Sequence, residues 1–260
     1  MNDPVLPTVP TAPTAQVAPG VQGVPGAAAP GIAPAGTNPG IPDYLNDTYW
    51  WAYVRPWAVQ IFERQWLVNL ILWGNFNRLR EAALDLLGAS LPGRTLQIAC
   101  VYGDLTPHLL RRLEPADQLD VVDILPVQLH NLARKLGPQP RVSMHLGDSS
   151  HLPFADASYD RALLFFLLHE QPAAVRSATL AEALRVLKPG GELVIVDYHR
   201  PRATHPLRLP MACILRTLEP YAMDLWRHEI EAWLPRDFVP AAFERSTLFG
   251  GLYQLIRIRV

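Results

Sequence analysis

Two aspartates occupy positions at which a chain of alternating strands and helices would bring carboxylates to one edge of a sheet. Asp123 ends the apolar segment 119–122, and Asp148 follows the apolar segment 142–146. Open α/β sheets bind ligands at the carboxyl ends of their strands. A carboxylate after the second strand of such a sheet can accept hydrogen bonds from both hydroxyls of a ribose. The position of Asp123 therefore predicts a nucleoside site.

A turn with the sequence LQIACVYGDLT is the second candidate for binding. It resembles motif I of class I methyltransferases, in which a strand runs into a Gly-rich turn and then a helix. In that family the glycines let the backbone approach the methionine portion of the cofactor, because a Cβ would collide. Gly103 matches this pattern and Ala99 is small. Val101 and Tyr102 replace a glycine and a small polar residue, and Gln97 replaces an acidic one.

Three further segments follow in the order typical of these methyltransferases. GDSSHLPF at 147–154 resembles the segment whose aspartate accepts a hydrogen bond from the adenine amino group, here Asp148. SYD at 158–160 opens the fourth strand, and RVLKPGGEL at 185–193 resembles the turn into the fifth. The resemblance implies S-adenosylmethionine as cofactor. The residues expected to contact it are Ala99, Val101, Tyr102, Gly103, Asp123, Ile124, Asp148 and Ser149.

A more particular set of motifs resembles the rhodoquinone biosynthesis protein family, RquA. The match covers about Tyr44 to Val260 and rests on WWAY (50–53), FERQWLVN (62–69), ACVYGD (99–104), FFLLHEQP (165–172), VDYHRP (196–201), DLWRH (224–228) and FGGLY (249–253). Members of that family are related to quinone methyltransferases, yet convert ubiquinone to rhodoquinone by replacing a ring methoxy group with an amino group. The resemblance implies S-adenosylmethionine as the amino donor, together with a divalent metal, manganese being favoured.

The crowded turn offers a physical reason for amino transfer. Methyl transfer needs the sulfonium methyl aimed at a nucleophile, whereas amino transfer needs the α-amino group aimed at the quinone ring. Val101 and Tyr102 add bulk where small residues usually hold the amino-acid tail. We expect the tail to be displaced while Asp123 and Asp148 hold the nucleoside.

Polar residues after the fourth and fifth strands are candidates for proton transfer and for metal binding. Tyr102, His169 and Glu170 are the predicted catalytic residues, which would handle protons on the amine. Asp197 and His199 are the predicted manganese ligands, since manganese prefers oxygen and imidazole donors. A metal there would act as a Lewis acid on a quinone carbonyl. Each residue could instead simply line a pocket, and the other possible ligands are His205, His228 and Glu229.

Two other functions remain open at this point. The first is methylation of a quinone or a similar lipophilic phenol, with the same fold and cofactor. The second is a methyltransferase-like partner subunit that has lost catalysis, because the turn departs from motif I.

The elements that must position these residues alternate from residue 93 onward. We expect strands at 95–100, 119–122, 142–146, 161–166 and 193–197, and helices at 105–113, 126–136 and 173–187. This order predicts right-handed βαβ units in an α/β, Rossmann-like, mostly parallel sheet of the class I methyltransferase type. An antiparallel terminal strand at 252–260 should follow the turn at Gly250-Gly251. The segment at about 201–240 should form a helical cap over the substrate.

The N-terminal part differs sharply in composition. Residues 1–42 are rich in Pro, Ala and Gly, which predicts a disordered tail. Residues 43–92 are crowded with aromatic side chains and predict helices that act as a lid, touch a membrane interface, or simply pack on the main domain.

Charge and cysteine content exclude several classes of function. The net charge of −1 and the absence of like-charge runs argue against nucleic acid as a partner. Two cysteines form neither a disulfide framework nor a metal-type spacing. No apolar run approaches the roughly 20 residues of a membrane span, and no secretory signal is evident. We expect a cytoplasmic protein, peripheral at the inner membrane, whose partner is ubiquinone or a related polyprenyl quinone.

Overall fold

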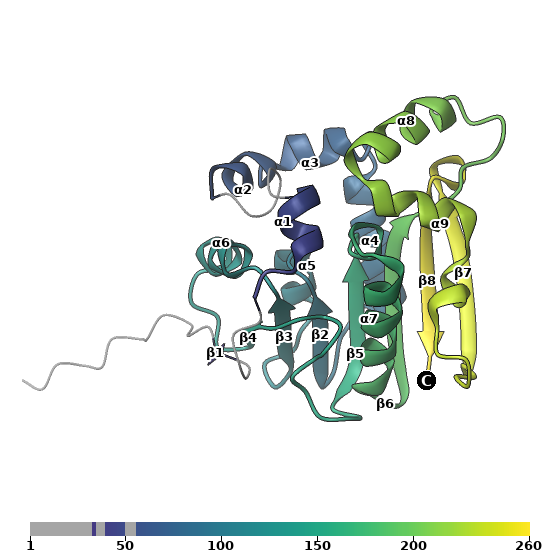
Figure 1. The fold of residues 1–260 in the computed structure, drawn as a ribbon. Helices are drawn as coiled ribbons and strands as arrows, with labels where there is room; N and C mark the ends of the chain where they lie inside the picture. The colour runs from purple at the N-terminus through teal and green to yellow at the C-terminus, as the bar shows by residue number, and fades with distance from the viewer. Residues whose placement is uncertain (1–32, 35–39, 50–55) are drawn as a thin grey trace, which may run out of the picture.

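A computed structural model describes residues 33–34, 40–49 and 56–260 of the chain. Its centre is one sheet with strand order β1-β4-β3-β2-β5-β6-β8-β7 (Figure 1). The pairs from β1 to β6 are parallel, and β8 runs antiparallel to both of its neighbours. The predicted α/β sheet, mostly parallel with an antiparallel terminal strand, is confirmed.

The central parallel strands are mainly apolar because both faces of the sheet are covered there. In β3, five of six residues are buried. The bounds are β1 Ala33–Pro34, β2 Arg94–Ile98, β3 Gln118–Asp123, β4 Val142–Leu146, β5 Tyr159–Phe165, β6 Leu187–Tyr198, β7 Ala242–Leu248 and β8 Tyr253–Arg259. Strand β6 begins six residues before the expected start at 193, because Leu187 pairs with Tyr159 of β5 ahead of the main ladder.

Helices cover the two faces of the sheet as right-handed crossovers require. Helix α7, Ala173–Arg185, lies on one face, and α4 and α5, Phe76–Leu87 and Leu105–Arg111, lie on the other (Figure 1). Helix α6, Pro126–Leu136, connects β3 to β4. It begins at a proline, whose fixed φ suits the first helical position.

A second group of helices lies beyond the carboxyl ends of the parallel strands (Figure 1). From the N-terminal side these are α1 Asp43–Tyr49, α2 Pro56–Phe62 and α3 Gln65–Ile71. From the segment after β6 they are α8 Arg208–Leu218, the short 3-10 helix η3 Pro220–Met223, α9 Asp224–Arg227 and η4 Ile230–Trp233. The two parts touch where the Trp73 indole donates to the Met211 sulfur at 3.0 Å. Helices in 43–92 and 201–240 thus occur where the sequence predicts them.

The predicted disordered tail, residues 1–42, lies mostly outside the described residues. One part of it, β1, pairs with β4 at the sheet edge. Within the described ranges, no helix has the length and apolarity needed to cross a membrane.

Candidate functional site

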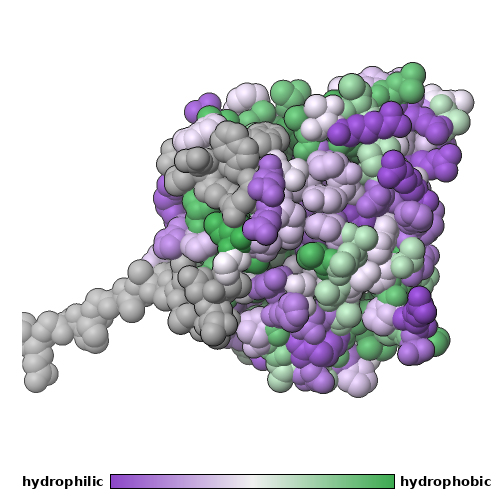
Figure 2. Space-filling view, viewed as in Figure 1, coloured by the Kyte–Doolittle hydropathy of each residue, from purple (hydrophilic) through white to green (hydrophobic). Residues whose placement is uncertain are grey.

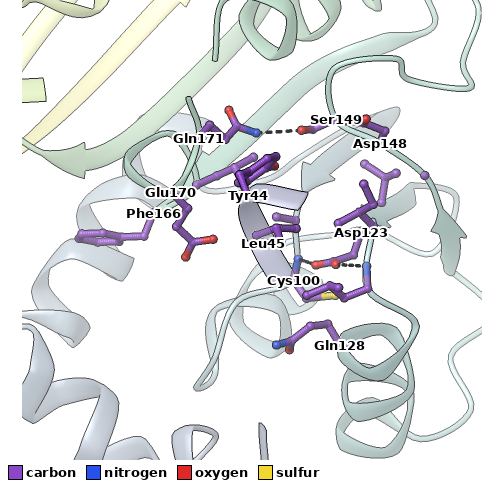
Figure 3. A pocket seen from close by; sticks show the side chains of 16 residues that line it. Tyr44, Leu45, Cys100, Asp123, Gln128, Asp148, Ser149, Phe166, Glu170 and Gln171 are labelled. Carbon is purple, nitrogen blue, oxygen red and sulfur yellow. Dashed lines mark hydrogen bonds between the residues drawn. The ribbon is translucent and has the colours of Figure 1, made fainter. Parts of the chain in front are cut away.

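A pocket at the carboxyl ends of β2, β3 and β4 brings together five of the residues predicted to bind the cofactor. We call it the strand-end pocket (Figure 3). The five are Ala99, Asp123, Ile124, Asp148 and Ser149. Tyr44 and Leu45 of α1 extend over it, and the free space that remains is about 70 Å³.

Asp123, at the end of β3, holds two neighbouring backbone segments of the pocket together by hydrogen bonds. Its Oδ2 accepts a hydrogen bond from the Cys100 amide at 2.7 Å, and its Oδ1 accepts one from the Leu125 amide at 2.8 Å. Burial raises the pKa of Asp123 to about 6, although these backbone hydrogen bonds act in the opposite direction. The carboxylate therefore links β3 to the turn after β2 and still lines the pocket.

The opposite side of the strand-end pocket is polar as well. Asp148 Oδ1 accepts hydrogen bonds from the amide and the hydroxyl of Ser150, both at 2.8 Å. The Gln171 amide donates to Ser149 Oγ at 3.0 Å. Gln171 Oε1 is buried and has no hydrogen-bond partner among the described residues. A buried acceptor without a partner is costly, so a donor from a ligand fits here.

The turn after β2 keeps the backbone shape of a glycine turn without the glycines. Ala99 adopts a φ of 73°, a left-handed conformation that favours glycine. Gln97 closes the turn: its amide donates to the Ala99 carbonyl at 2.9 Å, and its oxygen accepts from the Thr106 hydroxyl at 2.9 Å. A neutral side chain thus performs this contact where the related motif has an acid.

Val101, Tyr102 and Gly103 do not line the strand-end pocket. Val101 and Tyr102 face a larger space on the other side of the turn. The Gly103 carbonyl accepts a hydrogen bond from Lys135 Nζ at 2.6 Å. A Cβ at Gly103 would lie 2.9 Å from the Phe76 ring. Packing against α4 is therefore sufficient by itself to explain the glycine at position 103.

That larger space is an apolar cavity of about 530 Å³ between α3, α8 and the sheet. Its walls include Val68, Leu72, Phe165, Met211 and Leu215. It adjoins the strand-end pocket, because Cys100, Gln128, Phe166 and Glu170 line both. Tyr102 lies in its wall, where its hydroxyl accepts a hydrogen bond from Gln128 at 2.8 Å.

His169 forms the most polar wall of the apolar cavity. Its Nδ1 lies 2.9 Å from Asp197 Oδ1, and its Nε2 lies 3.8 Å from Glu170 Oε1. Burial lowers the pKa of His169, but Asp197, Glu219 and Glu170 raise it more, to about 9. At neutral pH the ring is therefore a cation that presents an N–H donor from Nε2.

Sequence reasoning missed several lining residues, and four of them with polar side chains are Gln171, Tyr44, Gln128 and Glu219. Gln171 lies inside one of the family-like motifs and could have been chosen from it. No local pattern marks the others, because long-range packing brings them to the site: Tyr44 from α1, Gln128 from α6 and Glu219 from the end of α8.

Comparison with known proteins shows which family the chain belongs to. A family model described as a methyltransferase domain matches residues 95–191. The ubiquinone/menaquinone biosynthesis C-methyltransferase UbiE of Pseudomonas paraeruginosa is 30% identical over 212 residues, which cover 74% of this chain and 82% of that protein. The chain belongs to the UbiE-like class I S-adenosylmethionine methyltransferases.

Other relatives of this family match over a shorter region. The demethylmenaquinone methyltransferase of Beutenbergia cavernae is 36% identical over 138 residues, 52% of this chain and 53% of that protein. The match thus spans about half the length of that relative. Among solved structures, the N-methyltransferase NodS from Bradyrhizobium japonicum aligns with a TM-score of 0.51 at 17% identity, covering 71% of this chain and 98% of NodS. This last likeness shows the fold.

The strand-end pocket fits the cofactor of this methyltransferase family. Gln171 Oε1 is a buried acceptor without a partner among the described residues. Asp123 and Asp148 add carboxylate acceptors at the ends of two neighbouring strands. A Cβ at Gly147 would lie 3.1 Å from Val122 Cγ2, so packing against β3 favours glycine at this edge of the pocket.

The predicted manganese ligands do not fit a metal in this member of the family. Asp197 already accepts four hydrogen bonds, from the amides of Leu168, His169 and Tyr198 and from the His169 ring. A carboxylate has about four lone-pair sites, so none is left for a cation. His199 instead bonds through Nδ1 to the Gly251 carbonyl at 2.9 Å. The described residues contain no group of three metal-binding side chains, and the contacts of Asp197 and His199 give no support to the prediction that they share a metal.

Proposed function

We propose that this protein transfers a group from S-adenosylmethionine to the ring of a lipophilic quinone. The observation that carries this function is the junction of two spaces with complementary chemistry. A polar pocket at the strand ends opens, across Cys100, Gln128, Phe166 and Glu170, into a large apolar cavity. The names of relatives that act in ubiquinone and menaquinone synthesis support the choice of a quinone.

Protein side chains would position the cofactor and the quinone relative to each other. Asp123 accepts from the ribose, while Asp148 and Gln171 face the base. Tyr44 and Leu45 cover the pocket and exclude water; with about 70 Å³ of free space, α1 must shift to admit the nucleoside. When bound, the cofactor supplies the group that is transferred.

Glu170 stands where the two spaces meet and is the best placed proton acceptor. Figure 3 shows its carboxylate directed toward Cys100 and Gln128, away from the side chain of Gln171. An amine must lose a proton to become a nucleophile, and a ring carbon that is methylated must lose one afterwards. A carboxylate within hydrogen-bond reach serves either need. Glu170 is therefore the proposed general base, with His169 and Tyr102 as its polar neighbours.

Within this function we propose amination, the conversion of ubiquinone to rhodoquinone carried out by the RquA family. Two features of the turn support it. Val101 and Tyr102 line the apolar cavity, where their bulk would crowd the side on which a sulfonium methyl would have to meet the ring. Lys135 binds the Gly103 carbonyl from outside the pocket and pairs with Glu63 at 2.5 Å, which fixes the turn in this form.

Methylation of a quinone or lipophilic phenol is the alternative, favoured by the activities named for the relatives. Cofactor carrying heavy nitrogen in its amino group and heavy carbon in its methyl group separates the two reactions. We expect mass spectrometry of the quinone product to show the nitrogen label and a lost methoxy group. Product that contains only the carbon label would establish methylation instead. A Glu170→Gln variant is the control, because the proposed base is absent and either product should form more slowly.

We further propose that the protein takes its quinone from a membrane surface. Exposed apolar side chains of α2, α3 and α8 and of the turn after α3 form what we call the apolar rim. The rim consists of Trp57, Ile61, Trp66, Leu70, Ile71, Trp73, Leu209, Ile214 and Leu218. Figure 2 shows apolar side chains along the upper edge of the molecule, over α3 and α8. Several rim residues also line the cavity, so the rim is continuous with the quinone path.

Changing two rim residues should weaken binding to vesicles. Trp66 and Leu70 are 61% and 63% exposed, so replacing both with serine should cost little folding stability. Burial of one large apolar side chain is worth roughly 1.5–3 kcal/mol, and we expect the double variant to partition into phosphatidylglycerol–phosphatidylethanolamine vesicles at least about 10-fold more weakly. Cosedimentation measures this.

The matched control for the rim is Val239→Ser. Val239 is 86% exposed but precedes β7, at the end of the sheet opposite to the rim. It should bind vesicles like the wild type. Equal binding by the wild type and the rim variant would contradict the membrane proposal and leave the proposed reaction untouched.

A further inference from the structure

The segment from the end of β6 to the end of α8 carries an unbalanced positive charge. Residues 198–218, which we call the basic segment, contain four arginines and no aspartate or glutamate, although the whole chain has a net charge of −1. The four are Arg200, Arg202, Arg208 and Arg216. Their side chains form no ion pair or hydrogen bond with the residues that the structure describes. Elsewhere arginines commonly pair with an acid, as Arg185 does with Glu182 and Arg257 with Glu244.

Helix stability does not explain the first arginine of α8. Arg208 occupies the first position of the helix, where the end of the helix dipole is positive. A cation there is slightly unfavourable, whereas an acid would be favourable. Arg216 lies in the last turn, where a cation suits the dipole, and its side chain is exposed. The helix thus presents positive charge that no described residue neutralises.

The same helix carries part of the apolar rim. Leu209 is 82% exposed and adjacent to Arg208, and Arg216 follows it by two helical turns, on the same side of α8. Figure 2 shows hydrophilic side chains next to apolar ones over α8. Exposed leucine combined with arginine on one helix is typical of segments that lie in a membrane interface. Surfaces that bind nucleic acid are more polar than this one.

We propose that the basic segment binds the headgroups of anionic phospholipids and so directs the apolar rim to an anionic membrane. This inference rests on the membrane uptake described under the proposed function and names the class of lipid. A guanidinium group donates two parallel hydrogen bonds to a phosphate. The long arginine side chain lets this charge stay among the headgroups while the apolar neighbours enter the interface. Each arginine near such a surface should strengthen partitioning about fivefold.

Vesicles of two compositions separate charge from apolar contact. One consists of phosphatidylcholine alone, and the other of phosphatidylcholine mixed with phosphatidylglycerol. We expect the double variant Arg208→Gln, Arg216→Gln to bind the anionic vesicles at least about 10-fold more weakly than the wild type. Its binding to the neutral vesicles should be unchanged, because the rim is intact. Cosedimentation measures both, and the unfolding temperature checks that the fold persists.

The matched control is the double variant Arg236→Gln, Arg259→Gln. It changes the net charge by the same amount, but position 236 precedes β7 and Arg259 ends β8, at the end of the sheet opposite to α8. It should bind both kinds of vesicle like the wild type. Raising the ionic strength from about 0.1 M to about 1 M shortens the screening length from about 10 Å to about 3 Å. The preference of the wild type for anionic vesicles should then disappear.

The outcomes separate this inference from the proposals on which it rests. If the wild type binds neither kind of vesicle, membrane uptake fails together with this inference, and the proposed reaction is untouched. If the wild type binds both kinds equally, the inference is overturned while membrane uptake stands. An equal loss in the control would assign the effect to net charge and not to α8, which also overturns it. Displacement of the wild type from anionic vesicles by a short RNA would indicate a general site for polyanions, with the same consequence.

Discussion

The double variant Asp123→Asn, Asp148→Asn should bind S-adenosylmethionine at least about 100-fold more weakly than the wild type. Each hydrogen bond from a ligand to a charged acceptor contributes about 1.5–3 kcal/mol, and two are weakened. Asparagine keeps the shape of the side chain, but at position 123 its NH2 group faces one of the two backbone amides that the carboxylate accepts, so some loss of stability is expected as well. Titration calorimetry measures the loss, and the unfolding temperature reports on the fold.

The control for that measurement is Asp237→Asn, which alters an exposed aspartate near the other end of the sheet. It should leave cofactor affinity unchanged. Unchanged affinity in the double variant would mean that the strand-end pocket is not the nucleoside site. A wild type without any measurable binding would favour the remaining reading, a partner subunit without catalysis.

Asp197→Asn should be the most destabilising single change of those considered. Asp197 is fully buried, and its two oxygens accept three backbone amides and the His169 ring. Asparagine presents a donor to these donors and leaves a buried cation without its counterion. Breaking a buried pair in this way costs about 3–5 kcal/mol. We expect the unfolding temperature to fall by roughly 10 °C or more, measured by calorimetry.

The same pair makes stability depend on pH in a defined direction. The pKa of His169 is about 9 in the folded chain, against roughly 6.5 for an unpaired histidine. The folded state therefore holds the proton more tightly. The stabilisation is fully present below about pH 6.5 and is lost as the pH rises through about 9.

The free energy of unfolding should fall by at most about 3 kcal/mol over this pH range. Urea unfolding across this range measures it. A His169→Gln variant should lack this decline, because glutamine does not titrate. A wild type whose stability stays flat between these pH values would show that His169 is neutral when folded.

Much of the fold could be predicted from local sequence patterns. Alternating apolar segments and amphipathic helices predict β2 to β6 and α5 to α7 within a few residues, because these elements are decided by short-range patterns and burial. Turn residues such as Gly250 and Gly251 predict the antiparallel end of the sheet. The start of β6 was missed, because the pairing of Leu187 with Tyr159 depends on a neighbouring strand and not on a local pattern.

The candidate site, too, could be predicted only in part from the sequence. Asp123 and Asp148 could be placed from sequence because each follows a strand, and parallel strands end at one edge. Which way a turn directs its side chains is a different question. Val101 and Tyr102 are adjacent to Cys100, yet they face the apolar cavity and not the strand-end pocket.

The sequence by itself thus determined the α/β architecture and the two strand-end carboxylates, since spacing along the chain is enough to define them. Only the tertiary structure decided that Asp197 pairs with His169 and that Tyr44 covers the strand-end pocket. Such contacts join residues that are distant in the chain. They arise when separate elements bury their apolar faces together, and no local pattern records which polar groups are enclosed.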